Sequence, residues 1–223
     1  MTIGRQEGAV SYDTIPPLVT QVEYQAFQDA YDFFNAVLFE GRLPQVLITL
    51  QRRAGMRGYF HAERFDGRRA TNAVHELALN PNTFVARSDI EILSVLVHEQ
   101  VHVWQHTYGT PSRRNYHNRE WADHMQAIGL SPSSTGEPGG KETGQRVSHW
   151  IVPEGVYARA YAQLEATGFC LHWQSKPDES AARGKKASKT KYTCPDCGLN
   201  AWAKPDVVLV CGGCDTPLAA QDA

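Results

Sequence analysis

Apolar residues recur along the chain at helical spacing in some stretches and at strand spacing in others. The pattern predicts helices over residues 20–40, about 89–106, 117–128 and 155–167. Short apolar runs predict strands over residues 46–50, 55–61, 74–79 and 169–173. The middle strands are joined by an Arg/Gly/Asp-rich turn around residues 65–67, and Asn80-Pro81 ends the last of them before the second helix.

The second predicted helix carries a pattern of charged and imidazole side chains, His98-Glu99-Gln100-Val101-His102. Because a helix has about 3.6 residues per turn, His98 and His102 project from one face and can bind one Zn²⁺. Glu99 lies beside them, where it can take a proton from a water on the metal. The alternative is an exposed helix with two solvated histidines. The strongly apolar surroundings favour the metal site, since unpartnered buried imidazoles are costly.

A catalytic zinc needs a third protein ligand and an open position. His106 is one turn further along the same helix, and a turn advances about 5.4 Å, which places it too far away. The next predicted helix offers His117, Glu120 and His124 at i, i+3 and i+7. Glu120 would complete a His-His-Glu site and His117 a three-histidine site, and spacing alone favours neither. His124 is expected to support the site or the core without binding the metal.

The C-terminal part of the chain contains two C-x-x-C pairs, formed by Cys194, Cys197, Cys211 and Cys214. Glycines directly after Cys197 and Cys211 suit the tight turns of a zinc ribbon. Four thiolates leave no open position, so this second zinc is expected to be structural. A redox dithiol is the weaker alternative. The remaining Cys170 has apolar neighbours, and we expect it to be buried.

Length and charge set the outer limits of these predictions. A chain of 223 residues with a net charge of −2 fits one ordinary domain plus a small module. No apolar run approaches the roughly 18 residues of a membrane span, and the first residues lack a signal-peptide pattern. We therefore expect a cytoplasmic protein that does not bind membranes, associated with the nucleoid if it is bacterial.

Composition predicts four segments. Residues 1–17 form a loosely ordered N-terminus, 18–174 a catalytic domain, 175–191 a basic linker and 192–223 the zinc ribbon. Residues 131–145, rich in Ser, Gly, Thr and Pro, are expected to be a surface loop.

Several ordered motifs resemble the SprT-like metalloprotease family, which includes the eukaryotic protease Spartan. They are Gly41-Arg42-Leu43-Pro44, Gly58-Tyr59-Phe60, residues 76–81, residues 98–102 and His117-Asn118-Arg119-Glu120-Trp121. The resemblance covers roughly residues 20–130 and implies an α+β zincin-like domain, with helices packed on a small, mostly antiparallel sheet. It also implies that His117 is the third zinc ligand, which leaves Glu120 to support a ligand. The family commonly has Gly where this chain has Asn118, a residue that tolerates similar backbone conformations.

The resemblance implies a zinc-dependent endopeptidase in which a zinc-bound water attacks the peptide carbonyl and Glu99 is the general base. Tyr59 is a candidate for binding substrate and stabilising the oxyanion. By resemblance to Spartan, the substrates would be proteins bound or crosslinked to DNA. The alternatives are a DNA-binding accessory or regulatory protein without proteolysis and a hydrolase of small amides.

Two basic regions are candidates for contacting DNA. Arginines crowd positions 52–69, and lysines and arginine crowd positions 183–191 of the linker. Tyr192 and Trp202 could stack on bases if they are exposed. A solvated hairpin tip and a solvated linker are the alternatives.

Overall fold

A computed structural model describes residues 18–69, 72–113, 116–176 and 189–221. It divides into two compact units, Met1–Lys176 and Pro177–Ala223. The division falls inside the segment predicted to be a linker. The predicted loose N-terminus and most of that linker lie outside the described residues. No helix in the described ranges is long and apolar enough to cross a membrane.

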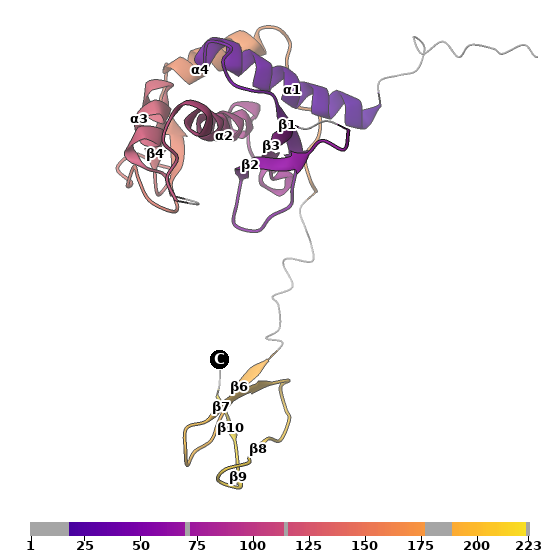
Figure 1. Cartoon of the computed structure of the whole chain (residues 1–223), viewed down its shortest axis with the longest axis vertical. Helices are drawn as coiled ribbons and strands as arrows, with labels where there is room; N and C mark the ends of the chain where they lie inside the picture. The colour runs from indigo at the N-terminus through magenta and orange to yellow at the C-terminus, as the bar shows by residue number, and fades with distance from the viewer. Residues whose placement is uncertain (1–17, 70–71, 114–115, 177–188, 222–223) are drawn as a thin grey trace, which may run out of the picture. The chain divides into compact units, whose positions relative to one another are not determined.

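The first unit contains four α-helices, a three-stranded sheet and a hairpin within its described ranges (Figure 1). In chain order these elements are α1 (Val19–Leu38), β1 (Val46–Leu50), β2 (Gly58–Asp66), β3 (Ala73–Leu79), the short 3-10 helix η2 (Pro81–Thr83), α2 (Asp89–Tyr108), α3 (Arg119–Ala127), β4 (Leu130–Ser133), β5 (Ser148–Ile151) and α4 (Val156–Glu165). The α+β fold predicted from the sequence is therefore confirmed.

The sheet places one free edge beside the predicted catalytic helix. Its strand order is β1-β3-β2, with β1 parallel and β2 antiparallel to β3. Ile48, Leu77 and Phe60 are register partners that face the core cluster. A Cβ added to Gly58, on the same face of β2, would meet side chains of α2, so α2 covers this face.

Helix α2 is the central element of the unit and packs against β2, β3 and the other three α-helices (Figure 1). Its N-terminus is fixed by the capping box formed by Ser88 and Glu91, where the backbone N–H of Ser88 donates to Oε2 of Glu91 at 2.8 Å. An almost unbroken row of apolar residues from Ile92 to Val97 is buried. This burial fixes the rotation of the helix and hence the direction of the histidines that follow.

Three local predictions were wrong. The segment expected to be a surface loop begins as the buried strand β4, which pairs antiparallel with β5 and leaves Ser133 fully buried. Residues 169–173 form no strand; the backbone N–H of Leu171 instead donates to the Asp89 carboxylate at 2.9 Å. Cys170, within this segment, is exposed and not buried. In residues 169–173, backbone N–H groups donate to side-chain oxygen atoms on the helices, where in a sheet they would donate to a neighbouring strand.

The second unit is a small β structure. Strands β6 (Thr190–Thr193), β7 (Asn200–Ala203) and β10 (Ala219–Gln221) form a sheet of order β10-β6-β7, and β8 (Val210–Cys211) pairs with β9 (Thr216–Pro217). Its buried cluster is small and consists of Tyr192, Cys194, Cys211 and Leu218. So few buried side chains cannot hold a fold of this size alone, which agrees with a metal-dependent unit.

Candidate metal centre

Three histidines from two elements converge in the first unit. His98 and His102 project from one face of α2, and His117 precedes the N-cap of α3. One ring nitrogen of each lies within 4.8 Å of the others. The structure thus brings together the three residues predicted as zinc ligands.

The loop after β4 holds His117 in place. His117 and Gly144 form a two-way backbone bridge, and Nδ1 of His117 lies 3.1 Å from the Gly144 carbonyl. A salt bridge between Arg119 and Glu142, at 2.6 Å, ties the same loop to α3. The segment that the sequence identified as a Gly-rich loop therefore carries part of the metal centre.

The indole of Trp121 packs against all three histidines. Its ring centroid lies 4.8 Å from that of His98, 5.3 Å from that of His102 and 4.2 Å from that of His117. Trp121 is fully buried and belongs to the main core. The histidine group is consequently built onto the hydrophobic core and is not a cluster of solvated side chains.

Burial keeps the three imidazoles neutral. Desolvation, aided by the charges of neighbouring histidines, lowers the pKa of His98 well below its usual value and that of His102 to about 3. Burial lowers the pKa of His117 too, although the Gly144 carbonyl opposes the shift. Neutral imidazole is the form that binds a metal. Three such donors, with no fourth protein donor in the group among the residues that the structure describes, fit a catalytic zinc site.

Glu99 follows His98 in α2, and its carboxylate is buried against Gly58 and Phe60 of β2, with 5% of the residue exposed. Desolvation raises the pKa of Glu99 to about 8, while the backbone N–H of Phe60 in β2 acts in the opposite direction. A carboxyl group whose pKa lies near neutrality suits proton transfer at that pH.

The other predicted site residues lie elsewhere. Glu120 accepts hydrogen bonds from the Gln105 amide at 2.6 Å and from the Thr110 backbone at 2.8 Å, and among the described residues it forms none with a histidine ligand. His124 stacks on Trp104 at 3.9 Å between ring centroids. Both residues thus stabilise the junction of α2 and α3 instead of supporting a ligand.

Tyr59 is also placed away from the histidine group. Consecutive strand residues point to opposite faces, and the neighbours Gly58 and Phe60 face α2. Instead, Cζ of Arg53 lies 5.4 Å from the centroid of the Tyr59 ring, and the Tyr59 hydroxyl interacts with Glu76. This geometry gives no support to the expected oxyanion role.

Two buried residues beside His98 escaped the sequence analysis. His149 of β5 lies 3.1 Å from His98 between the two Nδ1 atoms, and its Nε2 lies 2.8 Å from the Ser94 hydroxyl. His149 lies 51 residues after His98 in the sequence. No spacing rule connects the two positions, and it is the structure that shows His149 as the one buried residue of β5.

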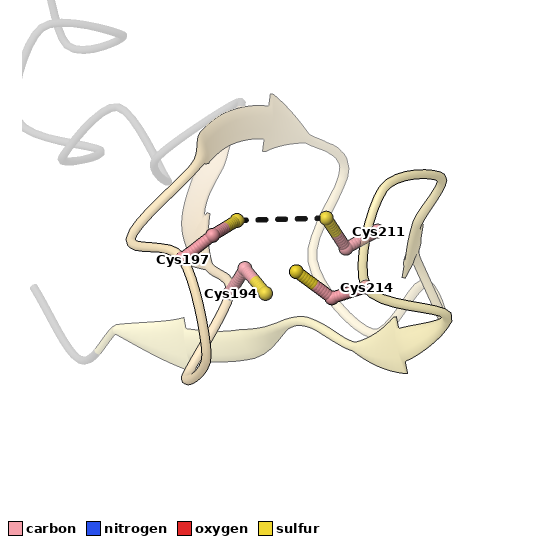
Figure 2. A group of neighbouring side chains, drawn as sticks. All are labelled: Cys194, Cys197, Cys211 and Cys214. Carbon is pink, nitrogen blue, oxygen red and sulfur yellow. Dashed lines mark hydrogen bonds between the residues drawn. The ribbon is translucent and has the colours of Figure 1, made fainter.

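The second unit holds the other candidate metal centre. The sulfur atoms of Cys194, Cys197, Cys211 and Cys214 lie within 4.8 Å of one another (Figure 2). All four cysteines are free, and Sγ of Cys197 lies 3.7 Å from Sγ of Cys211. Backbone N–H groups of Gly213 and Cys214 lower the pKa of Cys211 to about 7. Four converging sulfurs fit a structural zinc.

Comparisons with known proteins agree with this geometry. The family model described as "SprT-like family" matches residues 27–138. A protein of Salmonella typhimurium described as "uncharacterized protein in mucB 3′ region" is 47% identical over 60 residues, which cover 27% of this chain and 81% of that protein. The segment matched by the family model, residues 27–138, includes Glu99 and the three histidines. Membership of this family supports a metalloprotease-like function at family level. Because the family model spans half of the chain, the protein belongs to the SprT-like family.

Proposed function

We propose that the protein is a zinc-dependent endopeptidase that cuts proteins bound or crosslinked to DNA. The observation that carries the proposal is a buried Glu99 directly after His98, on the helix that supplies two of the three converging histidines. A purely structural metal site needs no buried carboxyl group of this kind. Glu99 therefore favours catalysis over an accessory protein that merely kept the fold.

Zinc bound by His98, His102 and His117 would lower the pKa of water and polarise a carbonyl group. Glu99 then supplies the acid–base chemistry. A nearby cation favours its carboxylate form, which takes the proton of the attacking water. The same carboxyl group later gives that proton to the leaving amine. Burial keeps bulk water from competing for the proton.

The edge strand β2 offers a means of aligning the substrate. Within the described sheet β2 pairs with β3 alone, so its other edge has unpaired backbone groups. Residues 58–60 of this strand lie next to Glu99. An extended peptide that pairs with this edge would have its backbone held beside the general base.

Arginines without a carboxylate partner support the DNA part of the proposal. Arg52, Arg53 and Arg57 line one pocket of about 470 Å³ together with Asn82 and Thr83. Among the described residues, salt bridges involve other arginines, namely Arg42 and Arg119. Arg53 lies over the Tyr59 ring and Arg57 donates to the Ser148 hydroxyl at 3.4 Å, so neither contact neutralises the positive charge that attracts phosphates.

The second unit contributes an exposed aromatic residue. Trp202 of β7 is 62% exposed, and Lys191 is its register partner on β6. An exposed indole beside a lysine suits stacking on an unpaired base next to a phosphate. Tyr192, the other aromatic candidate, is 3% exposed, so it serves the core of this unit instead.

The test is cleavage of a DNA-binding protein by the full chain, with and without single-stranded DNA. Wild type and Glu99→Gln are compared after zinc contents are shown to be equal. We expect cleavage that requires both DNA and Glu99. Cleavage without DNA would remove the DNA coupling and keep the protease. No cleavage by a zinc-loaded wild type would favour the accessory-protein alternative, and cleavage of short amides alone would favour a small-amide hydrolase.

A further inference from the structure

We propose that His149 is a positioning residue that fixes the tautomer and orientation of the metal ligand His98 through a hydrogen-bond chain ending at the backbone of α2. The inference rests on the metal site of the proposed function but not on proteolysis. It assigns a role to a strand residue outside both helices that carry the ligands.

The chain has three links. Nδ1 of His98 lies 3.1 Å from Nδ1 of His149, Nε2 of His149 lies 2.8 Å from Oγ of Ser94, and Oγ of Ser94 lies 2.8 Å from the carbonyl oxygen of Glu91. Ser94 and Glu91 belong to the first turns of α2, and His149 belongs to β5. The chain thus leaves the helix at His98 and returns to it at Glu91.

The last link sets the direction of every hydrogen bond. A carbonyl oxygen can only accept, so the single hydroxyl proton of Ser94 is donated to Glu91. Ser94 must then accept from Nε2–H of His149. A neutral imidazole with its proton on Nε2 has a lone pair on Nδ1, so His149 accepts from Nδ1–H of His98. The remaining ring nitrogen of His98, Nε2, consequently keeps its lone pair for a metal.

The hydrogen-bond chain is shielded from water, because His149 is 7% exposed and Ser94 is 4% exposed. Solvent therefore competes little for its donors and acceptors.

The tautomer of His117 is fixed by a single hydrogen bond to the backbone. Its Nδ1 faces the carbonyl oxygen of Gly144, which also only accepts, so Nε2 of His117 is the metal-binding atom. In the described part of the chain, Nδ1 of His98 has His149 as its hydrogen-bond partner and no carbonyl oxygen. His149 supplies the acceptor that the helix backbone cannot.

The test is the zinc affinity of the full chain, measured by competition with a chelator at neutral pH. The variant His98→Ala reports the zinc held by the four cysteines and is subtracted. We expect His149→Phe, which keeps the volume but lacks an acceptor, to weaken binding by about 10–100-fold. His149→Asn can place an oxygen near the position of Nδ1, and we expect affinity much closer to wild type. Ser94→Ala should weaken zinc binding less than His149→Phe does. In the double variant, Ser94→Ala should add little to the effect of His149→Phe.

The order of the two His149 variants separates positioning from packing. If His149 only filled space, phenylalanine would be the milder replacement and asparagine the more damaging one. That order, or wild-type affinity in His149→Phe, would overturn the inference. Thermal unfolding of the zinc-free variants checks the fold, and Ser94→Ala tests the chain with the His149 ring still present. If the wild type binds zinc at the histidine site but cuts no protein, the proposed function is refuted and this inference is not affected.

Discussion

Oε1 of Glu99 lies 3.1 Å from the position that a Cβ atom would occupy on Gly58. The same Cβ would approach the Ala78 carbonyl and Cγ1 of Val95 to 2.9 Å each. Strand β2 can therefore lie against Glu99 only because residue 58 has no side chain.

We expect Gly58→Ala to displace β2 or Glu99, to lower the free energy of unfolding by about 1–3 kcal/mol and to reduce cleavage further than this loss explains. Thermal unfolding and cleavage rate are the two measurements. Tyr59→Phe is the matched control on the same strand, and it should cleave at nearly the wild-type rate because its ring faces away from Glu99. Equal rates for Gly58→Ala and wild type would show that the contact has no catalytic consequence.

Asn80 organises the arginine-bearing loop between β1 and β2. Its amide donates to the carbonyl oxygens of Arg53 and Met56 at 2.8 Å each, and its Oδ1 accepts from the Asn82 backbone. We expect Asn80→Ala to destabilise the protein by about 2–4 kcal/mol. It should also weaken DNA binding without changing the charge.

Titration of labelled single-stranded DNA against the folded variant measures the second effect. Gln25→Ala is the control, because it removes an exposed amide on α1 that bonds to Asp29 and lies outside the lining of the arginine pocket. Undiminished DNA binding by Asn80→Ala would separate this loop from the DNA contact.

Spacing alone left His117 and Glu120 as competing third ligands, the family resemblance implied His117, and the structure makes opposite predictions for the two residues. We expect His117→Ala to lose the catalytic zinc. Glu120→Ala should retain it, since its carboxylate bonds to Gln105 and Thr110. Metal analysis of both purified variants decides the question, and loss of zinc in Glu120→Ala with the fold intact would revive the His-His-Glu site.

His124 should make the protein sensitive to acid. Desolvation beside Trp104 and Phe39, with the charge of Arg42, lowers the pKa of His124, while Glu120 opposes the shift. The unfolded chain takes up this proton near pH 6.5 and the folded chain does so at lower pH. His124 therefore removes stability as the pH falls below about 6.5, by at most about 1.4 kcal/mol per pH unit.

The variant His124→Phe keeps the aromatic stack and cannot be protonated. Its midpoint of thermal unfolding should fall less than that of wild type between pH 7 and pH 5. Parallel pH profiles for the two proteins would contradict the assignment.

Metal removal should affect the two units differently. The second unit has a small core, so we expect a strong chelator to unfold it. The first unit has an extensive core of its own and should keep its helices. Limited proteolysis with and without chelator, followed by mass analysis, will show which segment becomes susceptible. Cys197→Ser should reproduce the chelator's effect on the second unit in the presence of zinc.

The sequence alone was sufficient to predict a candidate site wherever the metal-binding residues lie close together in one short segment. Helical periodicity places His98 and His102 on one face of α2. Two C-x-x-C pairs similarly predict four converging sulfurs. Such relationships follow from local backbone geometry, which is nearly the same in every protein.

Tertiary structure alone decided the relationships between distant segments. Spacing in the sequence favours neither Glu120 nor His117 as the third ligand. The structure distinguishes them, because the loop at Gly144 holds His117 toward α2. The face of β2 on which Tyr59 lies depends on which side α2 covers. His149 reaches His98 because β5 pairs with β4, a contact that no local pattern encodes. Periodicity fixes which side of an element is apolar, whereas the partner of that side is chosen by packing across the whole core.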